Sequence, residues 1–114
     1  MKKDKLFEDV KPEHYFFVCD GTVVKNLLDL VDALEYMDDY TFRYHVNEHK
    51  NDFYNWIKDV FQEEELAARI LPVKDKREIQ VAILREMVRR LLKNKKTNKK
   101  KAIKKNKKDK KKVV

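Results

Sequence analysis

The final 22 residues of the chain, 93–114, carry almost nothing that a folded domain could bury. They contain thirteen lysines and one aspartate, a net charge of +12, and their apolar side chains are only Ala102, Ile103, Val113 and Val114. A block of like charges with so little apolar surface cannot offset the entropy of folding. We therefore expect a basic tail, residues 93–114, that is disordered when free, and a hydrophobic core built from the residues before it.

Residues 1–92 have the opposite charge balance, with fifteen basic and nineteen acidic side chains and a net charge of −4. A chain of 114 residues that is 42% apolar has room for one domain with a modest core. No apolar run reaches the roughly 18 residues that a membrane span needs, so we expect a cytoplasmic protein without a membrane partner. Cys19 has no second cysteine to pair with, and we expect a small buried hydrophobe there.

Apolar spacing predicts mainly helix, because only one glycine and two prolines interrupt the chain. Residues 14–19, rich in aromatic and β-branched types and followed by Asp20-Gly21, predict one short strand and a turn; this strand could lie across helices or pair with a second copy. The first predicted helix covers 22–37, with Thr22 as its cap. The second begins after a cap at Asp38 or Asp39, and the third after a cap at Asn51 or Asp52. The fourth covers 62–71, and the last runs from a capping box at Asp75 and Glu78 toward Asn94.

The residues expected to face inward recur at helical spacing in each predicted helix. They are Val24, Leu27, Leu28, Val31 and Leu34; Phe42, His45 and Val46; Phe53, Trp56, Ile57, Val60 and Phe61; Leu66, Ala67 and Ile70; and, as one broad face, Ile79, Val81, Ala82, Ile83, Leu84, Met87, Val88 and Leu91. The predicted fold is a mainly α, compact four-to-five-helix bundle with one short N-terminal extended segment and a disordered basic tail. Its domains are a polar lead-in (1–13), a helical domain (14–92) and the basic tail (93–114).

The stretch HVNEH, from His45 to His49, fits the HxxEH pattern of zinc hydrolases, in which two histidines on one helix bind the metal and a glutamate acts as base. Asn47, Asn51 and Asp52 favour a turn between His45 and Phe53, which would make the imidazoles diverge. We therefore expect His45 to be a core histidine that bonds a neighbouring helix end, and no enzyme activity, metal or cofactor.

The segment FRYHVNEHKNDFYNWIKDVF, residues 42–61, resembles a small helical domain family of archaea and bacteria whose function is uncharacterised. The shared pattern is FxxHVxxxxNDFxxWIxDVF with a downstream Leu-Ala, and the resemblance covers residues 15–71. It implies a helical module with no catalytic residues, and an archaeal source would fit it. The last helix and the basic tail lie outside this resemblance.

The basic tail suggests binding to phosphate backbones, because lysine is a compact point charge and the tail has no arginine or aromatic residue for reading bases. We expect RNA or DNA partners, such as the ribosome or the chromosome. The candidate nucleic-acid-binding residues are Arg85, Arg89, Arg90, Lys93, Lys95, Lys96, Lys99, Lys100, Lys101, Lys104, Lys105, Lys107, Lys108, Lys110, Lys111 and Lys112. The alternative is a protein-interaction module, with a protein partner on the helical domain and an accessory tail.

Overall fold

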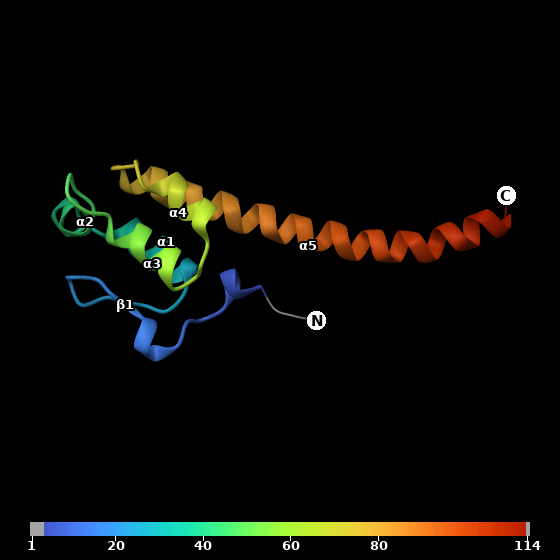
Figure 1. Ribbon diagram of the computed structural model, residues 1–114, viewed down its shortest axis with the longest axis horizontal. Helices are drawn as coiled ribbons and strands as arrows, with labels where there is room; N and C mark the ends of the chain where they lie inside the picture. The colour runs from blue at the N-terminus through green and yellow to red at the C-terminus, as the bar shows by residue number, and fades with distance from the viewer. Residues whose placement is uncertain (1–3, 114) are drawn as a thin grey trace.

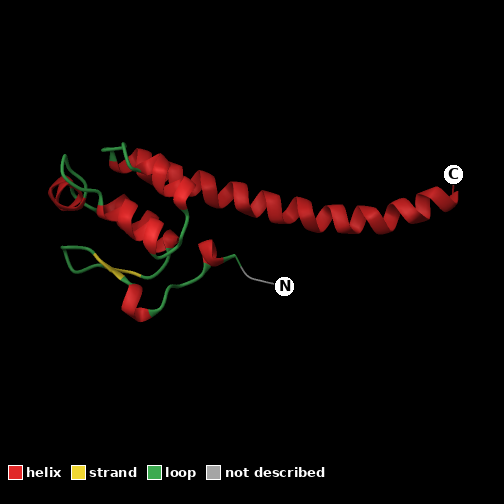
Figure 2. Ribbon diagram, in the orientation of Figure 1, coloured by secondary structure: helices red, strands yellow, loops and turns green. Residues whose placement is uncertain are grey.

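The computed structural model describes the backbone of residues 4–113 and the side chains of residues 4–95. Two short 3-10 turns, η1 (Lys5–Phe7) and η2 (Pro12–His14), precede a hairpin of β1 (Phe16–Phe17) and β2 (Val23–Val24). Five helices follow: α1 (Leu27–Tyr36), α2 (Asp39–His45), α3 (Asp52–Asp59), α4 (Glu64–Ile70) and α5 (Lys76–Val113). The protein is therefore mainly α with one short extended segment, as predicted (Figure 2).

The hairpin differs from the sequence prediction, because the strand finds its partner within the chain. Phe16 pairs with Val24 and Phe17 with Val23 in an antiparallel register, so two valines assigned to the first helix form β2 instead. Gly21 sits in the connecting turn with φ +97°, a left-handed conformation in which a side chain is strained. The extended hairpin thus replaces the start of the predicted helix.

Helix α1 consequently begins at Leu27, and its cap is Asn26 rather than Thr22. The Asn26 side chain accepts a hydrogen bond from the Asp29 backbone N–H at 2.7 Å. With this start, Leu30 is fully buried whereas Leu28, which was expected inside, is 51% exposed. The helical face is therefore rotated relative to the predicted one.

Helices α2, α3 and α4 agree with the prediction in place and in buried face. Asp38 caps α2 and Asn51 caps α3, each through a side-chain oxygen that accepts a backbone N–H three residues on. The α3 stripe forms the centre of the core, since Phe53 and Ile57 are fully buried. Trp56 buries its indole beside them and donates Nε1–H to the carbonyl oxygen of His14 at 2.7 Å, which holds the N-terminal segment against α3.

Helix α5 carries two apolar stripes rather than the one broad inward face that was predicted. Ile79 and Ile83 are fully buried against α1 and α4, whereas Val81, Leu84, Val88 and Leu91 are 37–55% exposed. The other elements cover only one side of α5, so its second stripe faces outward. Asp75 caps the helix as expected, accepting from the Glu78 backbone N–H at 2.9 Å.

Helix α5 also extends beyond Asn94, the residue near which it was predicted to end. Its backbone continues to Val113 and projects away from the other elements, which gives the molecule an extent of 65 Å along its longest axis (Figure 1). Lysine and alanine are adequate helix formers and the segment contains no glycine or proline, so a helical backbone is accessible there. The disorder of the basic tail in the free protein stays a prediction, based on repulsion between like charges without packed partners.

Candidate nucleic-acid interface

The candidate phosphate-binding residues occupy the C-terminal part of α5. Arg85 and Arg89 lie on the exposed side of the helix, and Lys93 and Lys95 follow at the start of the basic tail. The remaining candidates, Lys96, Lys99, Lys100, Lys101, Lys104, Lys105, Lys107, Lys108, Lys110, Lys111 and Lys112, lie outside the described side chains. The structure thus joins the arginines and the basic tail on one continuous helix.

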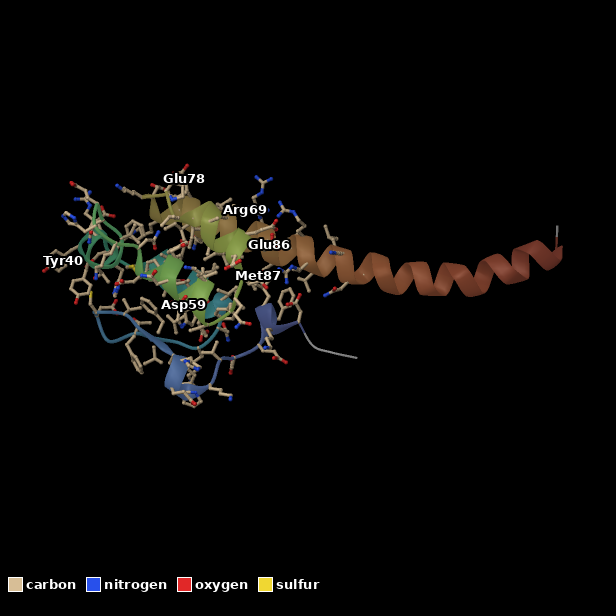
Figure 3. All side chains as sticks on the ribbon, in the orientation of Figure 1. Tyr40, Asp59, Arg69, Glu78, Glu86 and Met87 are labelled. Atoms are coloured by element: carbon tan, nitrogen blue, oxygen red, sulfur yellow. The ribbon has the colours of Figure 1, made fainter. Side chains whose placement is uncertain are left out.

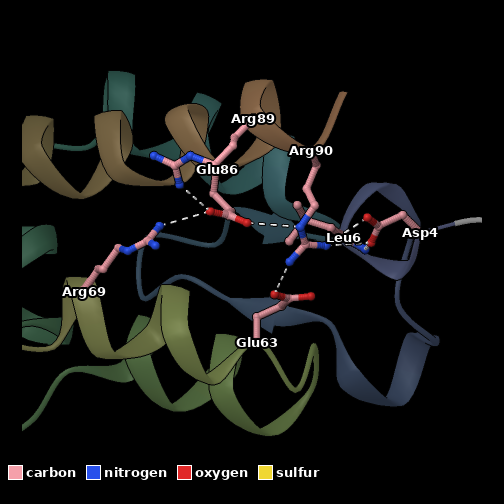
Figure 4. Close-up of polar contacts among 7 residues, drawn as sticks. All are labelled: Asp4, Leu6, Glu63, Arg69, Glu86, Arg89 and Arg90. Carbon is pink, nitrogen blue, oxygen red and sulfur yellow. Dashed lines mark hydrogen bonds and ion pairs between the residues drawn. The ribbon is translucent and has the colours of Figure 1, made fainter. Parts of the chain in front are cut away.

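Arg90 does not face solvent with the others, because it turns toward the N-terminal segment and the start of α4 (Figure 4). Its guanidinium donates to both Asp4 carboxylate oxygens at 2.8 and 3.1 Å and to Glu63 Oε1 at 2.5 Å. Its Nε donates to Glu86 Oε2 at 3.0 Å. Arg90 is therefore engaged by three carboxylates and ties η1, the α3–α4 connection and α5 together.

Glu86 extends this network to two further arginines, as the labelled side chains in Figure 4 show. Arg69 of α4 donates to its Oε1 at 3.0 Å, and Arg89 donates to the same oxygen at 2.8 Å. The Glu86 side chain is only 13% exposed, whereas those of Arg69 and Arg89 are about half exposed. Arg89 therefore keeps an open face toward solvent although it is paired.

The network shifts the protonation of its own members. Partial burial acts against the charged form of Asp4, but the Leu6 backbone N–H and the Arg90 guanidinium outweigh it and hold the pKa of the Asp4 carboxyl below its ordinary value. Burial likewise opposes the charge of Arg90, whose pKa its bonds to Asp4 and Glu63 nevertheless raise. The network thus favours the charged forms of Asp4 and Arg90, as expected of an ion pair with a structural role.

The zinc pattern can be judged from the surroundings of His45. Its Nδ1 lies 2.9 Å from Asp52 Oδ2, and its Nε2 accepts the Cys19 backbone N–H at 3.0 Å. The ring is 4% exposed and contacts the rings of Phe16 and Phe53. With both ring nitrogens engaged, neither is available to a metal. His45 is a buried core histidine bonded to the start of α3, as predicted.

His49 lies away from this ring, in an exposed turn after α2 ends at His45. The Val46–Asn51 bridge closes that turn, so the helix required by the HxxEH pattern does not form. Within residues 4–95, no group of three histidine, cysteine or carboxylate side chains is placed to hold a metal. Cys19 is exposed rather than buried, because Val18 takes the inward position of this extended segment.

Two features of the site were missed from the sequence. Nothing in the spacing of Asp4, Glu63 and Arg90 indicates that they meet, because 86 residues separate Asp4 from Arg90. The cap of α3 was expected to be Asn51 or Asp52; Asn51 is the cap, and Asp52 instead contacts His45 and Lys50, a role that was not predicted. The adjacent Asn51-Asp52 pair was the available signal that one of the two is free for another role.

Comparison with known proteins places the chain in a family. A family model described as a family of unknown function, DUF5752, matches residues 5–112. The chain belongs to this family. The match reaches beyond the expected 15–71 and includes all but the end of α5, so the expectation that the last helix and the basic tail lie outside the family is wrong. No curated protein and no solved structure matched the chain.

This DUF5752 member is a mainly helical domain, and the function of its family is unknown. No helix among the described residues is long and apolar enough to cross a membrane. The features that distinguish the site are therefore the outward apolar stripe of α5, the exposed Arg85 and Arg89, and the basic tail that continues the same helix.

Proposed function

We propose that the protein is a non-catalytic, cytoplasmic protein associated with nucleic acid or ribonucleoprotein, which binds phosphate backbones through the basic tail. The observation that supports this most is the separation of charge along the molecule. Residues 93–114 carry +12, whereas residues 1–92 carry −4, and the α5 backbone runs outward through residues 93–113. A polyanion would be attracted to the tail and repelled by the helical domain.

The ion pairs of the helical domain strengthen this division. Arg69, Arg77 and Arg90 each contact a carboxylate of the same chain. Such arginines offer less positive field to a phosphate than unpaired ones, and Arg90 is also three-quarters buried. We therefore assign the contacts to nucleic acid to the basic tail, with Arg85 and Arg89 at its base and Arg90 in a structural role. Arg89 is paired with Glu86, but its side chain is 52% exposed and can still face a phosphate.

Salt titration of binding tests the proposal with the full-length chain. Lys99, Lys104 and Lys108 are replaced by glutamine, which keeps the helix propensity but removes three positive charges. If each lysine contacts a phosphate of duplex DNA, the slope of log K against log salt falls in magnitude by about 2 to 3. Repeating the titration with a structured RNA hairpin shows which nucleic acid is preferred.

A matched variant separates the basic tail from net charge. Lys11, Lys58 and Lys74 are exposed outside the basic tail, and replacing these three by glutamine changes the net charge by the same amount. The slope should then stay at the wild-type value. Equal loss in both triple variants would show that overall charge drives binding, and absence of binding by the wild-type chain at moderate salt would refute the proposal.

A protein-interaction role is the second candidate, favoured by exposed tyrosines far from the basic tail. Tyr36 and Tyr40 are 87% and 82% exposed at the junction of α1 and α2, and Tyr40 projects at the end of the molecule opposite the C-terminus (Figure 3). Tyrosine is enriched at protein interfaces because it combines an apolar ring with a polar tip. Serine at both positions should abolish a protein contact there and leave the salt slope unchanged.

A further inference from the structure

The outward stripe of α5 has the spacing of a coiled-coil seam. Val81, Leu84, Val88 and Leu91 are separated by three, four and three residues, which places valine at both a positions and leucine at both d positions of two heptads. Lys95 and Asn98 take the next a and d positions, so the seam ends where the basic tail begins. We call these four residues the α5 seam.

The α5 seam lies on the side of the helix away from the core. At about 100° per residue, it is turned by roughly 120° from the line of Ile79, Ile83 and Met87 that packs on the bundle. Its four side chains keep 37–55% of their surface exposed, and Leu92 beside them keeps 54%. Together with Arg85 and Arg89, most of them line one shallow groove. The seam is therefore accessible to a second helix.

We propose that the α5 seam pairs with the same seam of a second copy of the chain, in parallel and in register. Valine at a with leucine at d is the combination that favours two parallel strands. In this arrangement Arg85 and Leu92 take the e positions, and Gln80 and Met87 take the g positions. Gln80 is buried and donates to Val31 and Glu35 of its own chain, and neither g residue is charged, so no like charges oppose each other across the seam. An antiparallel pair would instead bring the two copies' Arg85 together.

The size of the α5 seam determines how strong this pairing is. Residues 81–91 span about 15 Å of helix, and so short a contact buries much less than the roughly 800 Å² per partner of a standard interface. Parallel pairing also sets two tails of +12 side by side, at the 8–10 Å spacing of packed helices. The pairing is therefore weak at low salt, and it strengthens when the tail charges are screened or neutralised.

Disulfide trapping tests the pairing in the full-length chain. Val88→Cys is made together with Cys19→Ser, because the native cysteine is exposed and would form disulfides itself. In a parallel, in-register pair the two a-position thiols face each other, and a mild oxidant removes two electrons and two protons to form the disulfide. Raising the salt from about 0.1 M to about 1 M shortens the screening length from about 10 Å to about 3 Å, so the disulfide dimer should increase several-fold.

A control position and a mass measurement distinguish specific pairing from cross-links formed by random collisions. Arg89→Cys in the same background places the thiol off the seam, and it should cross-link much less than Val88→Cys at every salt concentration. Sedimentation of the chain without introduced cysteines should show a dimer at high salt that Leu84→Gln with Val88→Gln removes. The exposed leucines at Leu28 and Leu71, replaced by glutamine, form the matched control and should leave the dimer intact.

The outcome also separates this inference from the proposed function. Duplex DNA added at low salt should restore the Val88→Cys disulfide if the tails bind phosphate, because DNA neutralises them. Cross-linking at high salt without any effect of DNA would refute the nucleic-acid role of the tail and keep the seam. A monomer at high salt, with no more cross-linking at Val88→Cys than at Arg89→Cys, would overturn the pairing and leave the stripe to a different partner.

Discussion

Replacing Arg90 by glutamine should destabilise the protein by about 2 kcal/mol. Breaking a buried ion pair costs about 3–5 kcal/mol, whereas a surface pair is worth about 0–1 kcal/mol. Arg90 is 25% exposed, and its partners Asp4, Glu63 and Glu86 are 22%, 20% and 13% exposed, so an intermediate value applies. Glu86 keeps Arg69 in the variant, and the loss therefore falls mainly on Asp4 and Glu63.

Urea unfolding followed by fluorescence of Trp56 measures this effect, since that side chain is 7% exposed and its indole bonds the N-terminal segment. A loss of about 2 kcal/mol lowers Tm by roughly 10 °C in a domain of this size. Arg89→Gln is the neighbouring control: it removes one contact from a side chain that is 52% exposed and should cost less than about 1 kcal/mol.

The refuting result for Arg90→Gln is a free energy of unfolding within about 0.5 kcal/mol of the wild type, which is the range of ordinary surface substitutions. The network would then be no more than a set of surface contacts. If the same variant also lowered the salt slope of nucleic-acid binding by about 1, Arg90 would be a phosphate contact as the sequence predicted.

Three further variants test other parts of the structure. His45→Ala should cost about 2–4 kcal/mol in urea unfolding, because it empties a core site, leaves the Cys19 N–H without its acceptor and leaves the Asp52 carboxylate with Lys50 alone; bound zinc lost in this variant would contradict the core role. Gly21→Ala should cost about 1 kcal/mol from backbone strain alone, since an added Cβ meets no atom within 4 Å; an unchanged midpoint would count against the positive φ. Asp4→Asn should be less stable than wild type at pH 7, and the difference should shrink as the pH falls below 3.8: the folded pKa of Asp4 lies below its ordinary 3.8, so its stabilisation is present above that value and disappears as the pH falls through the folded pKa. A difference that does not change with pH would assign the effect to another cause.

The sequence predicts an element best when that element depends only on residues close together in the chain. Phe53, Trp56 and Ile57 recur at helical spacing after a polar cap, and this local pattern correctly placed α3 and its buried face. The prediction for the hairpin was less complete, because Val23 and Val24 suit a helix stripe and a strand equally well. Only their pairing with Phe16 and Phe17 across the turn decides between the two.

The features of the candidate site likewise fall into those that local sequence predicts and those that depend on distant segments. The charge of the basic tail, the caps of α2, α3 and α5, and the buried role of His45 follow from composition and local spacing, because each depends on residues close together in the chain. The engagement of Arg90 by Asp4 and Glu63, the exposure of Cys19 and the outward direction of the α5 seam depend on segments that are distant in sequence. Periodicity predicted one broad apolar face on α5, but only the packing of α1 and α4 decides which part of that face is buried and which part is left exposed.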